Sequence, residues 1–422
     1  MSGILVDKGL TRQDRLVLQN LAADVRDYRR RRRNEGQKQP GKGHAARRRD
    51  AATLATLKAL NDPAGALFHP TIFTSTELHN LHLPGILERW LLRPLVRTAR
   101  SVLRVETDVV MIMHLLLYFC TSVPSAAFLY WNFSYVHGLL HLAMQATYMG
   151  TYTLMMHQHI HLGGILSKRY AVLDAAFPYI TDPLMGHSWN SYYYHHVKHH
   201  HVENNGPDDL SSTMRYQRDN FVHFLCYAGR FYFLIWLDLP LYFLRKNRIE
   251  LAAKAALWEL GWYATLWHLY TLNAKATLVA FILPLLGLRA GLMVGNWGQH
   301  AFVDKERPGS DYRSSITLID SNRHCFNDGY HTSHHLNPLR HWREHPVSFI
   351  GSKAEYASQG ALVFHGIDFM MITVRLLLKD YRTLAECMVP IGSQIFMTMD
   401  ERVDFLKGRT RQFTDKDIQR KR

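Results

Sequence analysis

Cysteine is scarce in this chain, with four residues in 422. The four thiols lie far apart in the sequence, and their spacing matches neither a zinc-binding motif nor a disulfide framework. Cys120 and Cys226 fall inside apolar stretches. We therefore expect reduced, structural cysteines without a catalytic role.

Targeting and nucleotide-binding signals are missing as well. The first residues contain no apolar core of the kind that a secretory signal has, and acidic residues interrupt the basic ones too often for a transit peptide, so we expect neither. The sequence has no Gly-x-Gly-x-x-Gly motif, which argues against a bound flavin or nicotinamide nucleotide. Electrons for any redox reaction must therefore come from outside the chain.

Acidic residues are outnumbered, since 35 Asp and Glu stand against 50 Lys and Arg, a net charge of +15 at pH 7. The runs Arg29–Arg33 and Arg47–Arg49 predict a basic, largely disordered cytosolic arm over residues 1–85. Such an arm can bind nucleic acid. Long apolar segments follow it, however, and positive charge is typical of the cytosolic flank of membrane spans. We therefore expect no nucleic-acid partner.

Histidine, by contrast, is abundant, with 26 residues. Neutral imidazole is a ligand for zinc, copper, iron and nickel. Eight or more imidazoles from four places are too many for one ion, so the pattern predicts a two-metal centre. The four motifs are His157-Gln-His-Ile-His161, His195-His-Val-Lys-His-His-His201, Asn296-Trp-Gly-Gln-His300 and His331-Thr-Ser-His-His335.

The first two motifs differ in how clearly they identify ligands. His157 and His161 are four residues apart, share a helix face and can bind one metal, whereas His159 points elsewhere. The second motif leaves three alternatives open, and at least three of its five histidines should be ligands. These alternatives are His196/His199/His200, His196/His200/His201 and His195/His199/His200.

The last two motifs complete the predicted set. Asn296 and His300 share a helix face, and because an amide is a weak ligand, Asn296 should act through water. Carboxylates of the acidic tract Glu203–Asp209 could hold the imidazole nitrogens that do not bind metal, although a solvated loop is equally compatible with this tract. His331, His334 and His335 form the last cluster, while His187, His223 and His268 stand alone and should be interior or interfacial.

The segment over residues 86–106 predicts an amphipathic helix. Five arginines recur there every three or four residues and form one basic stripe, as in helices that lie on an anionic membrane surface. They are Arg89, Arg93, Arg97, Arg100 and Arg104.

Residues 107–350 should form a membrane domain. It contains four stretches long enough to cross about 30 Å of hydrocarbon, joined by short links into two hairpins. Glu259 and Arg289 interrupt the second hairpin at similar depth, and we expect them to face each other or a polar cavity, because an unpaired charge facing lipid is costly. The predicted spans are about 109–131, 134–156, 252–272 and 276–299.

Residues 221–244 are apolar too, but a span there would place the first two histidine motifs on the opposite side from the last two. We therefore expect this segment to lie in the membrane interface. The predicted fold is an all-α integral membrane protein with two transmembrane hairpins and a cytosolic helical cap that carries a di-metal site. Residues 351–422 should form a cytosolic helical C-terminal region whose end, from about residue 400, is charged and loose.

In motif type, motif order and attachment to two hairpins, residues 107–345 resemble the membrane-bound fatty-acyl desaturase/hydroxylase superfamily. The resemblance implies a histidine-box centre of two iron ions that uses O₂ as co-substrate at the cytosolic boundary of a membrane. The implied catalytic residues, which are also implied metal ligands, are His157, His161, His196, His199, His200, His300, His331, His334 and His335. His195 and His201 are implied as metal ligands only.

The resemblance also implies a substrate and partners. The substrate would be the acyl chain of a membrane lipid or acyl-CoA, and the expected outcome is a double bond, with hydroxylation as the alternative. Cytochrome b5 and its reductase in the endoplasmic reticulum, or ferredoxin in a plastid, would supply electrons. A non-enzymatic metal-binding or transport protein is a more distant alternative, because a transporter should place its ligands near mid-membrane.

Overall fold

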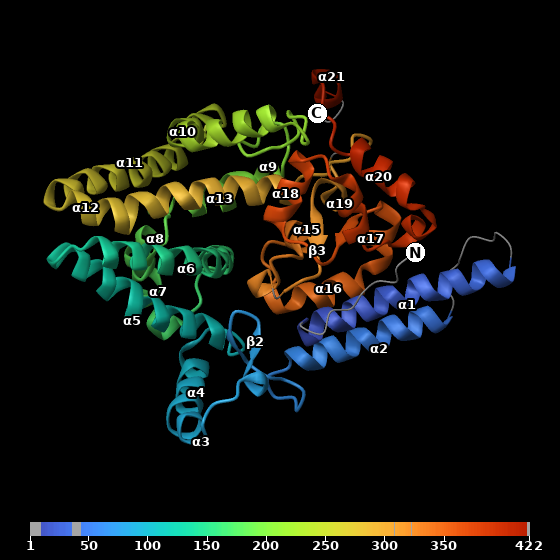
Figure 1. Ribbon diagram of the computed structural model, residues 1–422, viewed down its shortest axis with the longest axis horizontal. Coiled ribbons are helices and arrows are strands. Elements are labelled where there is room, and N and C mark those ends of the chain that lie inside the picture. The colour runs from blue at the N-terminus through green and yellow to red at the C-terminus, as the bar shows by residue number, and fades with distance from the viewer. Residues whose placement is uncertain (1–9, 36–43, 308, 322, 420–422) are drawn as a thin grey trace.

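The computed structural model describes residues 10–35, 44–307, 309–321 and 323–419. Long helices form one end of the molecule, and short helices form a cap at the other end (Figure 1). Two helices near the N-terminus lie against this cap. The histidine motifs lie where the long helices meet the cap.

The first predicted hairpin is present as α5 (Val109–Trp131) and α6 (Tyr135–Leu162). The Ser134 side chain accepts a hydrogen bond from the backbone N–H of His137 and so caps the start of α6. Gly163 ends the helix in the left-handed conformation, at φ 68°. Because α6 continues past residue 156, it carries the first histidine motif in its last turns.

The second predicted hairpin is also present. Asn273 lies in the link, where its side chain accepts a hydrogen bond from the backbone N–H of Ala276. The far ends of the two hairpins touch, since Tyr130 Oη lies 2.5 Å from Thr277 Oγ1. The elements of this hairpin are α11 (Ile249–Leu272), α12 (Ala274–Thr277), the π-helical η5 (Leu278–Ile282) and α13 (Leu283–Gln299).

Three helices within the described residues are long and apolar enough to cross a membrane, which indicates a membrane protein. They are α5, α10 (Phe221–Arg245) and the continuous segment Ala274–Gln299. Helices α6 and α11 cover the other two predicted spans, but they are not among these three.

Helix α10 lies along the histidine region over much of its length. Near its N-terminus, the Tyr227 hydroxyl accepts a hydrogen bond of 2.6 Å from Asn296 Nδ2. Near its C-terminus, the ring of Tyr242 lies 4.2 Å from that of His199. Because Asn296 and His199 belong to motifs that meet in space, both ends of α10 lie at the level of the histidines.

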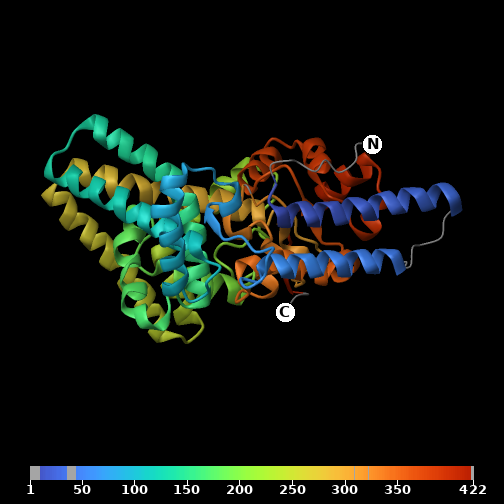
Figure 2. The same ribbon diagram turned by 90° about the horizontal axis from the view of Figure 1, so that it is seen from below.

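The expectation of a largely disordered arm is wrong for most of the described N-terminal residues. Helices α1 (Arg12–Glu35) and α2 (His44–Asn61) lie side by side against the cap (Figure 2). Val17, Leu18 and Leu21 are buried there with residues of the C-terminal region, so an apolar stripe at helical spacing gives α1 a buried face despite its many charges. The side chains of Arg29 and of residues 31–33 lie outside the described residues.

The segment predicted as an amphipathic helix is helical from residue 85 to residue 102. Trp90 and Ile86 on this segment are each 72% exposed, so it presents large apolar side chains as well as arginines. The segment comprises α3 (Gly85–Leu87), the π-helical η2 (Glu88–Leu92) and α4 (Arg93–Val102).

The cap is built from short elements, and the C-terminal region is helical as expected. β3 (Ile316–Leu318) pairs in parallel with β4 (Leu362–Phe364), and β1 (Thr71–Phe73) pairs antiparallel with β2 (Thr76–Glu77). The helices of the two interhelical connections and the cap are α7 (Ala171–Ala176), α8 (Pro178–Leu184), η4 (Tyr193–His200), α9 (His201–Glu203), α14 (Asp311–Ser314), α15 (His331–Leu336), α16 (His345–Gly351), α17 (Lys353–Gln359), α18 (Phe369–Leu377), α19 (Tyr381–Cys387), α20 (Met399–Gly408) and α21 (Asp415–Gln419).

The chain beyond residue 400 is not loose in its described part. Leu406, Phe413 and Ile418 are buried. Arg218 is fully buried and fixes this segment to the region around the histidines. Its guanidinium donates hydrogen bonds to backbone oxygens of Ala301, Thr213, Tyr216, Arg409 and Arg411.

Candidate metal centre

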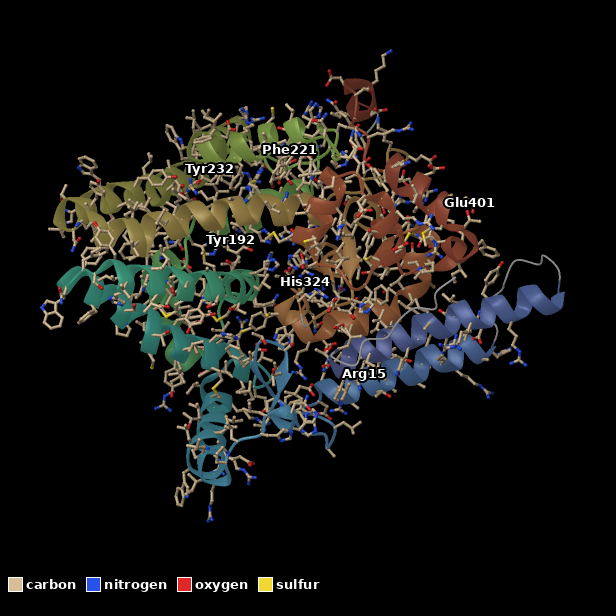
Figure 3. All side chains as sticks on the ribbon, viewed as in Figure 1. Arg15, Tyr192, Phe221, Tyr232, His324 and Glu401 are labelled. Carbon is tan, nitrogen blue, oxygen red and sulfur yellow. The ribbon has the colours of Figure 1, made fainter. Side chains whose placement is uncertain are left out.

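The four histidine motifs converge where the two hairpins meet the cap. The first lies in the last turns of α6, the second on η4 and α9, the third at the end of α13 and the fourth on α15. In Figure 3, Tyr192 and His324 mark this region between the hairpins and the cap. Eight of the predicted histidines gather there in two neighbouring groups, and a ninth, His331, lies beside one of them.

Group A consists of five histidines from three motifs, and four of them form a closed ring. Their Nε2 atoms are separated by 2.9 Å between His157 and His334, 2.8 Å between His334 and His201, 3.0 Å between His201 and His196, and 2.8 Å between His196 and His157. The ring of His161, the fifth member, lies 4.6 Å from that of His201 and 4.7 Å from that of His334. Its Nε2 is buried and has no hydrogen-bond partner.

The spacing in group A fits a metal ion. Imidazole nitrogens lie about 2.0–2.1 Å from a bound first-row metal, and two such ligands at right angles are then about 2.9 Å apart. The four Nε2 contacts of group A have this length. The unpartnered Nε2 of His161 can complete the donor set, so these residues are suited to one ion.

The π-helical winding of η4 explains why the second motif contributes both His196 and His201. In a π-helix the backbone N–H of one residue bonds to the carbonyl five residues earlier, and the N–H of His201 bonds to the oxygen of His196. Residues five apart therefore lie close together, which α-helical periodicity does not provide.

Group B consists of His200, His300 and His335, with His331 beside them. His331 Nε2 lies 3.0 Å from His335 Nε2 and 3.3 Å from His300 Nε2. The groups adjoin, since the ring of His201 in group A is 4.9 Å from that of His335. The arrangement can hold two neighbouring ions.

Three histidines of group B are oriented through their second ring nitrogen. Each Nδ1 donates to an oxygen acceptor, which leaves the lone pair of Nε2 directed at the group. The contacts are His200 Nδ1 to Asp209 Oδ2 at 2.7 Å, His300 Nδ1 to the Ser314 carbonyl at 2.7 Å and His335 Nδ1 to Asn204 Oδ1 at 2.5 Å. Asp209, which belongs to the acidic tract, is thus one of these acceptors.

The surroundings keep the histidines neutral, which is the form that binds metal. Five histidines outside the long helices of the hairpins have a pKa well below the usual value, mainly because they are buried and also because other imidazoles lie next to them. They are His196, His201, His331, His334 and His335. Burial opposes ionisation of Asp209, but His200 and His199 outweigh it and hold the pKa of this carboxyl well below its usual range.

Three histidines proposed as ligands from the sequence lie outside both groups, namely His331, which lies beside group B, and His195 and His199. His199 Nε2 accepts a hydrogen bond of 2.8 Å from the backbone N–H of Leu210, so this nitrogen is already engaged. His195 packs against Phe231, with ring centroids 4.9 Å apart. The geometry therefore places both histidines outside the groups, and their assignment as ligands stays a prediction. Of the three alternatives for this motif, only His196/His200/His201 places every member in a group.

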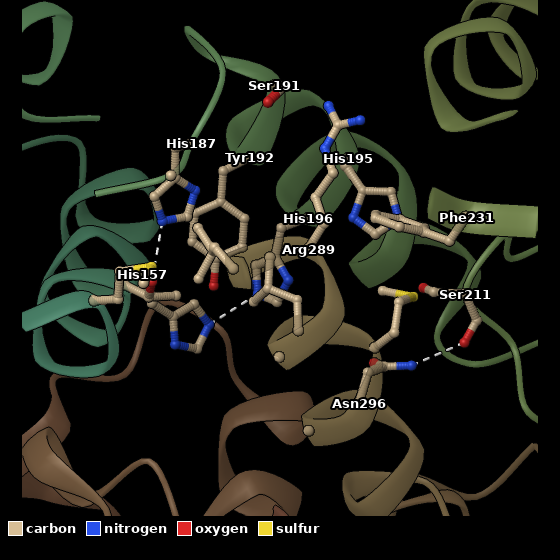
Figure 4. Close-up of a pocket in the computed structure, with 18 of the residues that line it drawn as sticks. His157, His187, Ser191, Tyr192, His195, His196, Ser211, Phe231, Arg289 and Asn296 are labelled. Atoms are coloured by element: carbon tan, nitrogen blue, oxygen red, sulfur yellow. Dashed lines mark hydrogen bonds between the residues drawn. The ribbon is translucent and has the colours of Figure 1, made fainter. Parts of the chain in front are cut away.

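Asn296 lies on α13, one helical turn before His300. Its amide nitrogen donates to the Ser211 carbonyl at 2.9 Å (Figure 4). The same nitrogen donates to Tyr227 Oη at 2.6 Å. These bonds use the nitrogen and leave Oδ1 as the free acceptor.

A cavity of about 710 Å³ adjoins both groups and extends between the two hairpins. Much of its lining is apolar, including Leu154, Ile235, Leu285, Leu288 and Leu292. His187, which the sequence placed as an ordinary interior residue, is buried but lines this cavity and bonds to Thr153 Oγ1 at 3.0 Å. Nothing in its sequence context signals that position.

Glu259 and Arg289 form an ion pair and both line the cavity. This confirms the expectation that they face each other or a polar space. The sequence alone did not indicate Asn204, Ser314 or Asp328 as partners of the histidines. Asp328 Oδ1 lies 3.4 Å from His157 Nδ1.

Comparison with known proteins adds a family assignment to this geometry. No curated protein and no solved structure matches the sequence significantly. The model of the fatty acid desaturase family matches residues 133–365, which is more than half of the chain and contains all four histidine motifs. Together with two histidine groups at the end of apolar helices, this match shows that the chain belongs to the fatty acid desaturase family.

Proposed function

We propose that this chain is an O₂-dependent, non-haem di-iron enzyme that introduces a double bond into the acyl chain of a lipid. The observation that carries the proposal is the pair of adjacent histidine groups beside one large, mostly apolar cavity. Membership of the family supports an oxidoreductase that acts on fatty acids.

Group A would hold one iron ion and group B, with His331, the other. Bound there, the ions supply O₂ activation and the removal of hydrogen from an unactivated C–H bond. Asn296 Oδ1 is placed to hold a water molecule next to group B, because Asn296 lies one helical turn before His300. Asp209, Asn204 and the Ser314 carbonyl keep the imidazoles of group B in their ligand tautomer.

The cavity would orient the acyl chain. Its apolar lining excludes water and its walls determine which carbon atoms lie next to the histidines, so proximity selects the bond that reacts. A substrate held slightly differently would be hydroxylated, which makes hydroxylation of the same chain the alternative outcome.

The proposed setting is the endoplasmic reticulum membrane, with the histidine groups on the cytosolic side. Cytochrome b5 and its reductase are the proposed electron donors, or ferredoxin in a plastid. Four spans, α5, α6, α11 and the α12–α13 segment, would bring all histidine motifs to that side.

The test is gas chromatography–mass spectrometry of total fatty acids, including amide-linked ones, from yeast that expresses the chain. We expect a new unsaturated species with the wild type and its loss with His334→Ala, because His334 contacts three members of group A. His268→Ala is the matched control, since His268 is exposed on α11. It should leave the product unchanged.

Iron content of the purified chain, measured by mass spectrometry, separates the alternatives. Two irons per chain together with a hydroxylated product would identify the chain as a hydroxylase instead of a desaturase. A metal other than iron, without any lipid product, would overturn the enzymatic proposal in favour of a metal-binding membrane protein.

A further inference from the structure

The cavity beside the histidines has one polar wall. The loop between α8 and η4 enters the space between the hairpins, where Gly186 lies so close to α13 that a Cβ atom would come within 2.4 Å of the Pro284 carbonyl. The polar wall that this loop forms with α11 and α13 consists of His187, Ser188, Ser191, Tyr192, Glu259 and Arg289.

Glu259 is satisfied within this wall. Its carboxylate accepts hydrogen bonds from Ser188, Tyr263 and Arg289, and Ser188 is itself 2.6 Å from Ser191. The Glu259 side chain is 6% exposed. Little of its capacity to accept remains for a ligand.

Arg289 differs from Glu259 in this respect. A guanidinium has five N–H groups, and Glu259 and Tyr263 on one side cannot accept all of them. The Arg289 side chain is 12% exposed and lines the cavity, so the remaining N–H groups face that space. Figure 4 shows Arg289 among the residues that line the cavity, with Ser191 and Tyr192 nearby in the view.

We propose that Arg289 is a substrate-binding residue that donates hydrogen bonds to a neutral oxygen of the lipid, the carbonyl or hydroxyl of an amide-linked or hydroxylated chain. The proposal deepens the proposed function and rests on it, since it assigns the substrate class of the same cavity. The acyl chain would run along the apolar lining, and its polar group would lie at the polar wall.

The position of Arg289 sets a distance between the polar group and the reacting carbons. Arg289 lies on α13, eleven residues before the C-cap residue His300, which corresponds to about 16 Å along the helix axis. Asn296 lies between them and also lines the cavity. A lipid that bonds to Arg289 would therefore react several carbon atoms from its polar group.

The chemistry of the pair favours a neutral acceptor over an anion. Glu259 already compensates the charge of Arg289, and an additional carboxylate or phosphate would place a net negative charge in a cavity with an apolar lining, at high desolvation cost. A neutral oxygen adds an acceptor without adding charge. A plain hydrocarbon would leave the N–H groups of Arg289 without a partner in the filled cavity.

The test is ligand binding to the purified, iron-loaded full chain in detergent, measured without turnover. The probes are a saturated N-(2-hydroxyethyl) fatty amide and an n-alkane with the same number of atoms in its chain. We expect the amide to bind at least about tenfold more tightly than the alkane, because only the amide can accept a hydrogen bond from the charged guanidinium. Equal affinities would overturn the proposal.

Substitutions assign the preference to Arg289. Arg289→Lys keeps the charge opposite Glu259 but removes the planar set of donors, and it should reduce the preference for the amide several-fold. The double variant Arg289→Gln/Glu259→Gln avoids a buried unpaired charge and should abolish the preference. It serves as the second variant should Arg289→Lys fail to retain iron.

The matched control is Arg230→Gln/Asp238→Asn, which removes an ion pair of similar composition from α10. Arg230 Nε lies 2.9 Å from Asp238 Oδ2, and neither residue lines the cavity. The control should keep the wild-type preference. If both Arg289 variants keep the preference for the amide, the inference is contradicted, even if the chain desaturates lipids. If the preference depends on Arg289 but the chain has no activity, only the proposed function is contradicted.

Discussion

Asp209 is the single side chain that links the histidine motifs most directly to the loop after them. Its Oδ2 lies 2.7 Å from His200 Nδ1, and its Oδ1 accepts from the backbone N–H of Ser211 at 2.8 Å. A carboxylate behind a ligating imidazole raises its basicity and fixes its orientation. Asp209 should therefore control metal binding without touching the metal.

We predict that Asp209→Ala lowers the affinity of group B for iron by about 10–100-fold, the usual effect of losing such a partner. The measurement is iron per chain after dialysis against a weak chelator. Asp208→Ala is the matched control, because Asp208 is the adjacent carboxylate but pairs with Lys246 at 3.1 Å. Equal iron loss in both variants would show that general acidity of the loop matters, not the contact with His200.

At the level of single residues, the sequence predicted the histidines of the two groups but not all of their hydrogen-bond partners. His157, His161, His300 and the histidines of the last motif are distinguished by spacing alone, since α-helical periodicity brings them to one face. The partner of His300 is a backbone carbonyl, that of Ser314, which any residue type could supply. No sequence signal can therefore identify it.

Among the elements, α1 has the least expected role. Asp14 on α1 is fully buried, accepts from the backbone N–H of Ser321 at 2.6 Å and from Tyr330 Oη at 2.9 Å, and so contacts the residue directly before His331. Lys353 adds a second connection, with Nζ 2.6 Å from Asp24 Oδ2. The N-terminal helices thus hold the cap that presents the last histidine motif, although they lie outside the family match.

We predict that Asp14→Ala destabilises the cap and lowers iron content. The substitution leaves two buried donors without acceptors, at about 1–3 kcal/mol each. The measurements are the thermal unfolding midpoint and the iron content of the purified chain. Asp27→Ala is the control on the same helix, since Asp27 pairs with Arg49 and is 44% exposed. Wild-type values for Asp14→Ala would mean that α1 merely covers the cap.

The prediction of a largely disordered arm over residues 1–85 relied on overall composition, in which charged residues dominate. Runs of arginine suggest a disordered segment, but folding of a helix depends on one apolar face. Val17, Leu18 and Leu21 supply that face, and its partner surface comes from the C-terminal region. Only packing between segments that are distant in the sequence shows that the face is buried.

For the whole molecule, the placement of α10 decides the topology. Both ends of α10 contact histidine motifs, through Tyr227 and Tyr242. A helix that crossed the membrane would carry its second end away from them. Large aromatic residues also mark the far ends of the hairpins, where Trp131 is 82% and Trp267 is 70% exposed, as in the aromatic belts of membrane proteins. We therefore propose that α10 lies in the interface, despite an apolar composition that would allow it to cross.

We predict that a tag inserted after Asn247, between α10 and α11, lies on the same side of the membrane as a tag at the N-terminus. A tag inserted before Asn273 should lie on the opposite side, because α11 would cross between them. Protease protection in sealed microsomes measures both. If α10 crosses instead, the two internal tags exchange sides.

The sequence by itself determined the histidine motifs, the helical hairpins and which histidines share a helix face, because residue type, hydrophobic length and helical spacing are local properties. The tertiary structure decided three further points: the placement of His196, His200 and His201 in the two histidine groups, the packing of α1 against the cap and the contacts of both ends of α10 with the histidine motifs. The first depends on π-helical winding, in which residues five apart meet. The other two depend on which surfaces, far apart in the chain, are buried together, and no local pattern encodes that.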